Sequence, residues 1–245
     1  RLDPQYATAY NNRGTAYTEL GEYEWAIEDY DEAIRLDPQY ANAYVSRGLA
    51  YGILGEYEKE IQDYDEAVRL DPQLVDAYYN RGVAYGLLGQ YEKAILDFDE
   101  AIRLDPQYAK VYRHRGTTYG MLGEYQKAID NYTEAIRLDP KHVKAYNMRG
   151  VSYNVLGQHE RAIQDYTEAI RFDPEYEVAY YNRGDAYYDL GQYEKAVKEF
   201  TEAIRVDPRC AFAYASRSNA YERLGQHDKA DADRRRYLEL LLEAK

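Results

Sequence analysis

The residues best suited to chemistry are few and lie far apart. The sequence has one cysteine, Cys210, and four histidines without the spacing of a metal site or of a nucleophile and its base. The histidines are His114, His142, His159 and His227. No glycine-rich phosphate loop is visible, and the carboxylates recur with a fixed period instead of converging. The residues therefore predict no catalytic centre, no metal site and no cofactor.

The recurring element is a segment of 34 residues. Asp-Pro dipeptides and a glycine column both follow this step. The dipeptides begin at Asp3, Asp37, Asp71, Asp105, Asp139, Asp173 and Asp207. The glycines are Gly21, Gly55, Gly89, Gly123, Gly157, Gly191 and Gly225. A constant period without insertions is typical of stacked copies of one small unit.

Each copy has the pattern of two helices. Tyr10, Gly14 and Tyr17 lie at steps of four and three, which places them on one face of a first helix. Ala26, Tyr30 and Ala33 repeat that spacing on a second helix. Gly21 lies between the two, where a helix end favours a residue that accepts a positive φ. Pro38 cannot continue the second helix, because it has no N–H to donate.

This order of residues resembles the tetratricopeptide repeat (TPR), a 34-residue helix pair. In the first copy the matching residues are Tyr10, Gly14, Tyr17, Gly21, Ala26, Tyr30, Ala33 and Pro38. The resemblance implies an all-α fold: a right-handed superhelix, or α-solenoid, of antiparallel helix pairs. First helices would line its concave face and second helices its outer face.

We expect one array over residues 1–245. Residues 1–6 match the end of a preceding copy, so we expect the sequence to be a piece of a longer array or a matured fragment. The predicted copies are 7–40, 41–74, 75–108, 109–142, 143–176, 177–210 and 211–244.

Composition narrows the classes of partner. The net charge of −13 disfavours nucleic acid, whose binding depends on neutralising phosphates. No apolar run approaches the ~20 residues of a membrane span, and no signal peptide is visible. We therefore expect a cytoplasmic protein with cationic or mixed partners.

An arginine column stands where the family usually has leucine. It comprises Arg13, Arg47, Arg81, Arg115, Arg149, Arg183 and Arg217. An arginine near a core needs an acidic partner, and the second helix offers Asp29, Asp63, Asp97, Asn131, Asp165, Glu199 and Asp233. We predict one pair in each copy, with Asn131 the weak case, against the alternative that these arginines face solvent. Asp31 and Glu32 are further expected to form ordinary surface pairs with Arg35.

Two places depart from the pattern. Glu60 replaces a small alanine, so its carboxylate must reach solvent or find a donor. The last copy has Ser218 for glycine and Arg234 for an aromatic residue, and it ends in the leucine-rich segment 238–242. Those leucines predict contact with a following segment or with another copy of the molecule.

Positions that vary within a strict repeat are free for recognition. On the first helices of copies 2 to 5 they form an apolar strip with small glycine gaps, and Lys110, Arg113 and Lys144 add a basic group. We predict a groove for an extended or helical peptide with acidic groups. The predicted binding residues are Leu49, Tyr79, Asn80, Val83, Lys110, Arg113, Lys144, Asn147, Val151, Tyr181 and Tyr188. The alternative is that the aliphatic members only pack adjacent first helices together.

Some TPR domains hold the carboxylate tails of heat-shock chaperones with a clamp of lysine, asparagine and arginine. Asn80 and Lys110 match two members of that clamp. Val45, Leu49 and His114 stand where the others should be, so co-chaperone activity is not supported.

Three functions follow from this pattern. The first is a non-catalytic protein–protein interaction scaffold that binds a peptide or partner segment in the concave groove. The second is a regulatory or substrate-presenting module of a larger multidomain enzyme. The third is an array that associates with itself end to end through residues 1–6 and the leucines.

Overall fold

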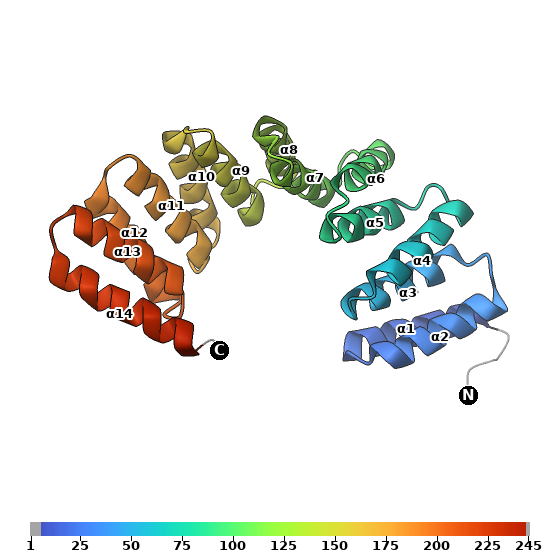
Figure 1. Cartoon of the computed structure of the whole chain (residues 1–245). Coiled ribbons are helices and arrows are strands. Elements are labelled where there is room, and N and C mark those ends of the chain that lie inside the picture. Colours follow the sequence, from blue (N-terminus) through green and yellow to red (C-terminus); the bar gives the residue numbers. More distant parts are fainter. Residues whose placement is uncertain (1–5, 244–245) are drawn as a thin grey trace. The chain divides into compact units, whose positions relative to one another are not determined.

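The computed structural model describes residues 6–243, which form fourteen α-helices and no strand (Figure 1). The predicted all-α fold of antiparallel helix pairs is confirmed. The first helices are α1 (Ala7–Leu20), α3 (Ala41–Ile53), α5 (Val75–Leu87), α7 (Ala109–Met121), α9 (Val143–Val155), α11 (Glu177–Asp189) and α13 (Ala211–Arg223). The second helices are α2 (Tyr23–Leu36), α4 (Tyr57–Leu70), α6 (Tyr91–Leu104), α8 (Tyr125–Leu138), α10 (His159–Phe172), α12 (Tyr193–Val206) and α14 (His227–Glu243). We number the repeats 1 to 7 by these pairs.

Both turns of a repeat follow from single residues. Gly21 has φ of +80°, and the N–H of Glu22 donates to the carbonyl of Tyr17 at 2.9 Å, which ends the first helix. The second helix ends at Asp37, whose backbone is extended before Pro38. The carboxylate of Asp37 then accepts the N–H of Gln39 at 3.0 Å. The residues that the sequence singled out therefore set the ends of both helices.

The chain forms two compact units, one up to Leu122 and one from Gly123. The first contains α1 to α7 and the second α8 to α14. We describe each unit by itself.

Within a repeat, the first helix lies close to an aromatic ring on the second. A Cβ on Gly82 would lie 2.7 Å from the ring of Phe98, and one on Gly14 would lie 2.6 Å from Tyr30. In repeat 7 the ring is replaced by Arg234, and Ser218 takes the glycine position and donates its hydroxyl to the carbonyl of Ala230 at 2.8 Å. The two departures in repeat 7 thus compensate each other.

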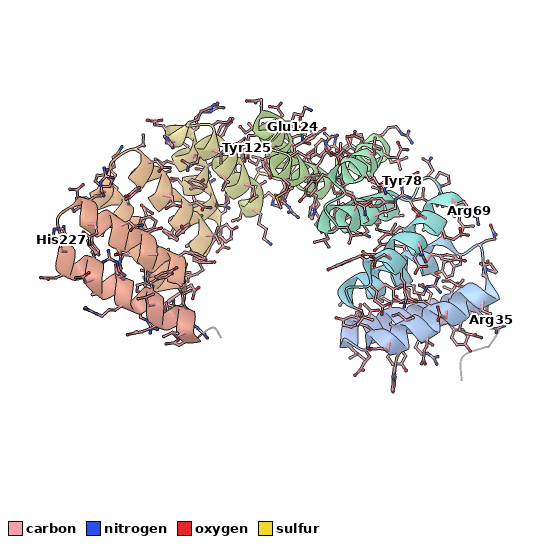
Figure 2. All side chains as sticks on the ribbon, in the orientation of Figure 1. Arg35, Arg69, Tyr78, Glu124, Tyr125 and His227 are labelled. Carbon is pink, nitrogen blue, oxygen red and sulfur yellow. The ribbon has the colours of Figure 1, made fainter. Side chains whose placement is uncertain are left out.

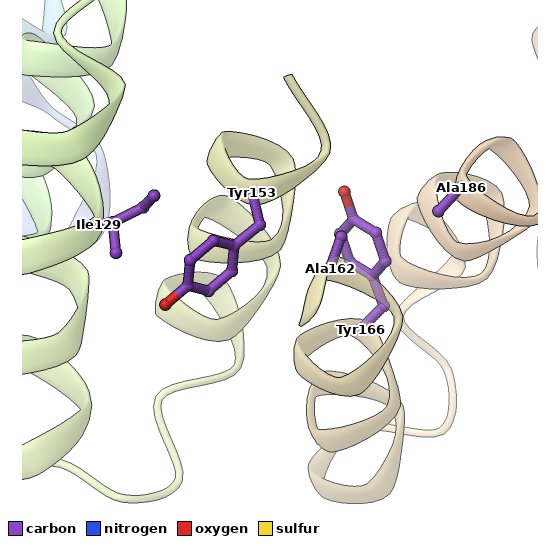
Figure 3. Packing of buried hydrophobic residues seen from close by; sticks show 5 residues of the cluster. All are labelled: Ile129, Tyr153, Ala162, Tyr166 and Ala186. Carbon is purple, nitrogen blue, oxygen red and sulfur yellow. The ribbon is translucent and has the colours of Figure 1, made fainter. Parts of the chain in front are cut away.

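The second unit shows how little space the cores leave. Tyr166 is buried between α9, α10 and α11, with Ala162 and Ala186 beside its ring (Figure 3). Tyr153 and Ile129 complete the cluster, and Val151 packs against it. Alanine at the crowded positions lets large rings fill the interior.

The predicted arginine pairs are confirmed in six repeats of the described chain. Arg81 donates through Nε and Nη2 to both carboxylate oxygens of Asp97, at 2.8 and 2.6 Å. The other pairs are Arg13–Asp29, Arg47–Asp63, Arg149–Asp165, Arg183–Glu199 and Arg217–Asp233. In repeat 4, Arg115 and Asn131 belong to different units, so the predicted weakness there stays a prediction. Asn131 donates to the carbonyl of Lys127 at 2.8 Å.

Each arginine from repeat 2 on has a second partner, which the sequence analysis missed. Its Nη1 reaches back to the second helix of the preceding repeat, as in the 2.7 Å bond from Arg81 to Asp65. The acceptors in chain order are Asp31, Asp65, Asp99, Thr133, Thr167 and Thr201. One guanidinium therefore joins three helices. We call this series of contacts the arginine ladder.

The ladder corrects one expected surface pair. Asp31 bonds to Arg47 of the next repeat and not to Arg35. Arg35 instead pairs with Glu32, and the exposed Arg69 pairs in the same way with Glu66 (Figure 2). The i,i+3 pairing was expected, but the i,i+4 pairing is wrong because a guanidinium from the neighbouring repeat occupies that carboxylate.

The ladder also accounts for one tyrosine column. The guanidinium of Arg81 lies 5.5 Å from the ring centroid of Tyr78, three residues earlier. The same contact recurs in every repeat: Arg13 with Tyr10, Arg47 with Tyr44, Arg115 with Tyr112, Arg149 with Tyr146, Arg183 with Tyr180 and Arg217 with Tyr214.

Replacing Arg81 by Met should lower the free energy of unfolding by about 2–4 kcal/mol, because it leaves the buried carboxylate of Asp97 without a partner. Burial already raises the pKa of Asp97, with Arg81 opposing that shift. Urea unfolding followed by circular dichroism measures the loss. Arg69→Met, which breaks an exposed pair, should change stability by less than about 0.5 kcal/mol. Equal losses in the two variants would contradict the role assigned to the ladder.

Candidate functional site

The first unit presents apolar side chains to solvent from its first helices. Leu49 and Ile53 lie on α3, Val83 and Leu87 on α5, and Met121 on α7. All but Val83 are exposed, and Leu87 and Met121 keep about two thirds of their surface accessible (64% and 66%). Adjacent first helices contact each other, so these residues follow one another across the unit. We call this set of five the apolar strip.

A pocket of about 210 Å³ opens in the strip between α5, α6 and α7. We call it the Gly86 pocket. Its lining residues are Gly82, Val83, Gly86, Leu87, Tyr91, Phe98, His114, Thr117, Thr118 and Met121.

The pocket exists because two positions in repeat 3 are small. A Cβ added to Gly86 would meet no atom within 4 Å, and the facing position on the second helix is Ala94. In repeat 2 the equivalent pair is Gly52 and Glu60, and a Cβ on Gly52 would lie 2.6 Å from the Glu60 carboxyl group. The same space is therefore open in repeat 3 and filled by a side chain in repeat 2.

The floor of the Gly86 pocket carries no hydroxyl. The core tyrosines of repeats 1 and 2 bond to polar neighbours, Tyr30 to Thr18 at 3.0 Å and Tyr64 to Glu60 at 3.2 Å. Repeat 3 has Phe98 at this position, which needs no such partner.

The polar groups in the wall are bonded to the protein. The hydroxyls of Thr117 and Thr118 donate to the carbonyls of Arg113 and His114, at 3.1 and 3.0 Å. His114 lies edge-on to Tyr79, with a ring separation of 5.4 Å, and its Nε2 is 3.3 Å from the Tyr79 hydroxyl. A side chain entering the pocket therefore meets mainly carbon atoms.

Glu60 is the most unusual titratable group in the first unit. It is 7% exposed; its Oε1 accepts the Tyr64 hydroxyl, and its Oε2 has no partner. Burial raises the pKa of Glu60 from its ordinary 4.5 to about 7, although the bond from Tyr64 opposes the shift. The expected donor is thus present, but it satisfies only one of the two oxygens.

Glu60 should make the protein less stable as the pH rises. The unfolded chain releases the proton near pH 4.5, whereas the folded chain keeps it up to about pH 7. Over that range the unfolded state binds fewer protons, so stability falls, and above pH 7 the whole penalty applies. Glu60→Gln should therefore gain about 1–2 kcal/mol on wild type between pH 5 and pH 8 in urea unfolding. Glu58→Gln, an exposed control on α4, should track wild type, and a pH-independent difference for Glu60→Gln would refute this account.

The predicted basic residues are divided between the units. Lys110 is exposed and Arg113 half-buried on α7 of the first unit, and Arg113 contacts His114. Lys144 is exposed on α9 of the second unit. Their grouping into one basic site stays a prediction. α7 carries Lys110, Arg113 and Arg115 and no acidic residue, although the chain is acidic.

The remaining predicted residues contact their neighbours within the units. Tyr79 lies against Phe98 and Tyr108, and Asn80 is half-buried on α5. Asn147 is buried and its Oδ1 accepts from Asn182 at 2.9 Å. The hydroxyl of Tyr181 lies 3.3 Å from Ser216 Oγ, and Tyr188 packs edge-on to Tyr193. A role for these residues in binding stays a prediction.

An acidic pair adjoins the tyrosines of repeat 6. Burial raises the pKa of Asp185 to about 6, and the charge of Asp189 adds to the shift. The side of α11 that carries Tyr181 therefore differs in charge from α7.

Residues 6–243 contain no group of three or more histidine, cysteine or acidic side chains placed to hold a metal ion. In the same part of the chain, no helix combines the length and apolarity needed to cross a bilayer.

Helix pairs repeated at a constant step define an α-helical repeat protein of the solenoid class. Models described as TPR repeat match residues 14–55, 50–89 and 150–191, and models described as tetratricopeptide repeat match 75–108, 109–142, 178–210 and 131–164. The chain belongs to the tetratricopeptide repeat family. Proteins of this family are generally protein-interaction scaffolds.

Solved structures agree with that assignment. A MamA protein is 29% identical, with a TM-score of 0.63 over 70% of this chain and 93% of its own. YrrB, described as a TPR protein with an unusual peptide-binding site, is 24% identical, with a TM-score of 0.63 over 75% of this chain and 95% of its own. A TPR protein from Parabacteroides merdae is 18% identical, with a TM-score of 0.75 over 96% of this chain and 93% of its own. The last two likenesses concern the fold alone, and no curated protein matches the chain.

Sequence reasoning predicted an apolar strip over copies 2 to 5, of which the first unit exposes members in repeats 2 to 4, but it did not predict the pocket. The glycine gaps at Gly52, Gly86 and Gly120 were visible, and so was the departure at Glu60. What was missed is that Glu60 fills the gap at Gly52, whereas the gap at Gly86 stays open and lines the pocket. The sequence signal for this was the presence of both Gly52 and Glu60 in repeat 2.

Proposed function

We propose that this protein is a non-catalytic scaffold that binds a peptide segment of a partner protein along the apolar strip of its first unit. The observation that carries the proposal is the strip itself, whose exposed members lie on three consecutive first helices beside a pocket. Exposed apolar side chains that follow one another across a surface are typical of interaction sites. YrrB, which shares this fold, is described as having a peptide-binding site of its own.

The charge of α7 suggests the second requirement of the ligand. Lys110 and Arg113 lie one turn apart on that helix, and the rest of the chain is acidic. An acidic group on the peptide would be attracted to α7, which places that part of the bound segment beside Lys110. Lys144 would extend this basic site if the two units bring α7 and α9 together.

Reversing the charge of α7 should weaken an acidic peptide selectively. We expect Lys110→Glu/Arg113→Glu to bind an acidic, leucine-containing peptide about 10-fold more weakly than wild type, and to bind the amidated, neutral version of that peptide with little change. Fluorescence anisotropy with labelled peptides measures both affinities. Lys59→Glu/Lys93→Glu, on second helices, is the matched control. Unchanged affinity for the acidic peptide would remove the basic site from the proposal.

One feature favours the expected end-to-end self-association: Leu238, Leu241 and Leu242 of α14 are exposed. The predicted association also involves residues 1–6, and residues 1–5 lie outside the described part of the chain. The arginine ladder disfavours association in the register of the array. The acceptor position of the last repeat holds Arg235, and a second copy docked in register would place its Arg13 there. Two guanidinium groups would then meet where other repeats have an arginine and a carboxylate or hydroxyl.

Arg235→Asp should restore an acceptor and promote association. We expect sedimentation equilibrium to show a mass that rises with concentration in this variant and a constant monomer mass in wild type. Arg234→Asp, on the adjacent residue, should resemble wild type. Association of wild type over the same concentrations would mean that the leucines suffice and that Arg235 does not block docking.

A further inference from the structure

We propose that the Gly86 pocket receives one bulky apolar side chain of the ligand, of leucine, methionine or phenylalanine size, and that the ligand carries a carboxylate about 10 Å away for Lys110. This inference rests on the proposed function and specifies its ligand. It names the chemistry that a partner segment must offer at two points.

The size of the pocket matches a single side chain. A dry cavity of about 150 Å³ holds a benzene ring, and the Gly86 pocket measures about 210 Å³. Phe98 forms a floor without a hydroxyl, and Val83, Leu87 and Met121 form the apolar wall.

The chemistry of the lining disfavours a polar guest. Thr117 and Thr118 donate their hydroxyls to the carbonyls of their own helix, and His114 Nε2 faces the Tyr79 hydroxyl. Apart from the Tyr91 hydroxyl, the lining offers a charged or amide side chain little in exchange for the water it would lose.

The distance to the carboxylate follows from the helix. Lys110 and Thr117 lie two turns apart on α7, and Arg113 lies between them on the same side. At 1.5 Å per residue, seven residues span about 10 Å along the axis. An extended ligand turns every second side chain to the same face, and four residues cover about 13 Å, enough to span that distance. The required spacing is therefore an apolar residue and an acidic residue four positions apart.

Repeat 2 shows that such a space is not a general feature of the stacking. There the equivalent gap beside Gly52 is filled by Glu60 of the protein itself. The Gly86 pocket is the equivalent space in repeat 3, where no side chain of the protein fills it. A side chain of the ligand with suitable volume would fit there.

The chain supplies its own reporter for this site. It has two methionines, Met121 in the wall of the pocket and Met148 on α9, outside its lining. With methyl-labelled methionine, we expect N-acetyl-leucinamide and N-acetyl-phenylalaninamide to shift the Met121 signal and to leave Met148 unchanged. N-acetyl-asparaginamide should shift neither signal.

The blocking variant is Gly86→Leu, whose side chain would enter open space and fill the pocket. Its matched control is Gly120→Leu, at the same helical position of repeat 4, where a Cβ also meets no atom and which does not line the pocket. Circular dichroism confirms that both variants are folded.

Short peptides test the spacing. We expect acetyl-Leu-Ser-Gly-Ser-Glu-amide, or its reversed sequence, to bind about 10- to 100-fold more weakly to Gly86→Leu than to wild type or Gly120→Leu. Ala in place of Leu should have the same effect, and Gln in place of Glu should weaken binding about 2- to 5-fold. No Met121 shift with any apolar probe, or equal binding to Gly86→Leu, would overturn the pocket.

The failure of the pocket and the failure of the proposed function give different results. Peptide binding that Lys110→Glu/Arg113→Glu weakens and Gly86→Leu leaves intact would refute the pocket and keep the scaffold. A Met121 shift with the amino-acid amides, without binding of any peptide of either direction, would refute peptide recognition and keep an apolar pocket.

Discussion

The structure depends on the ion pair between the arginine guanidinium on the first helix of a repeat and the carboxylate on its second helix. Arg81 bonds to Asp97 in its own repeat and to Asp65 in the preceding one, while its flat face lies over Tyr78. The geometry needs arginine: a lysine has one compact charge and cannot bond in three directions in a plane. Because a guanidinium such as that of Arg81 touches three helices, the pair within its hairpin also fixes how that hairpin stacks on its neighbour.

A rigid stack lets single residues decide what each repeat can bind. The backbone of repeat 2 and that of repeat 3 are set by the same glycines and prolines, so the space beside Gly52 and Gly86 is the same. Glu60 fills one of these spaces and Ala94 leaves the other open. The penalty for filling it with a carboxyl group is visible in the raised pKa of Glu60 and in its unpaired oxygen. Specificity here is a matter of which side chain, internal or external, occupies a gap.

Much of the fold could be predicted from the sequence, because period, helix ends and packing columns are local signals. The pairing of Arg13 with Asp29 was also predictable, since an arginine near a core needs an acid. The ion pair between repeats, from Arg47 to Asp31, could not be predicted, because Asp31 had a possible partner in Arg35 on its own helix. Only the stacking of the repeats shows that Asp31 pairs with Arg47. The apolar strip was predicted from positions that vary, whereas the pocket depends on the space beside Gly86 staying open in the folded chain. Lys110 and Lys144 lie in different units, and a local sequence pattern does not show how far apart they are.

The ladder changes its chemistry along the chain. In the first unit the acceptors between repeats are Asp31, Asp65 and Asp99, and in the second they are Thr133, Thr167 and Thr201. Dissolved ions screen half-exposed ion pairs and act much less on bonds to a neutral hydroxyl. Rising ionic strength should therefore weaken the bonds between repeats more in the amino-terminal half, which contains the pocket, than in the carboxy-terminal half.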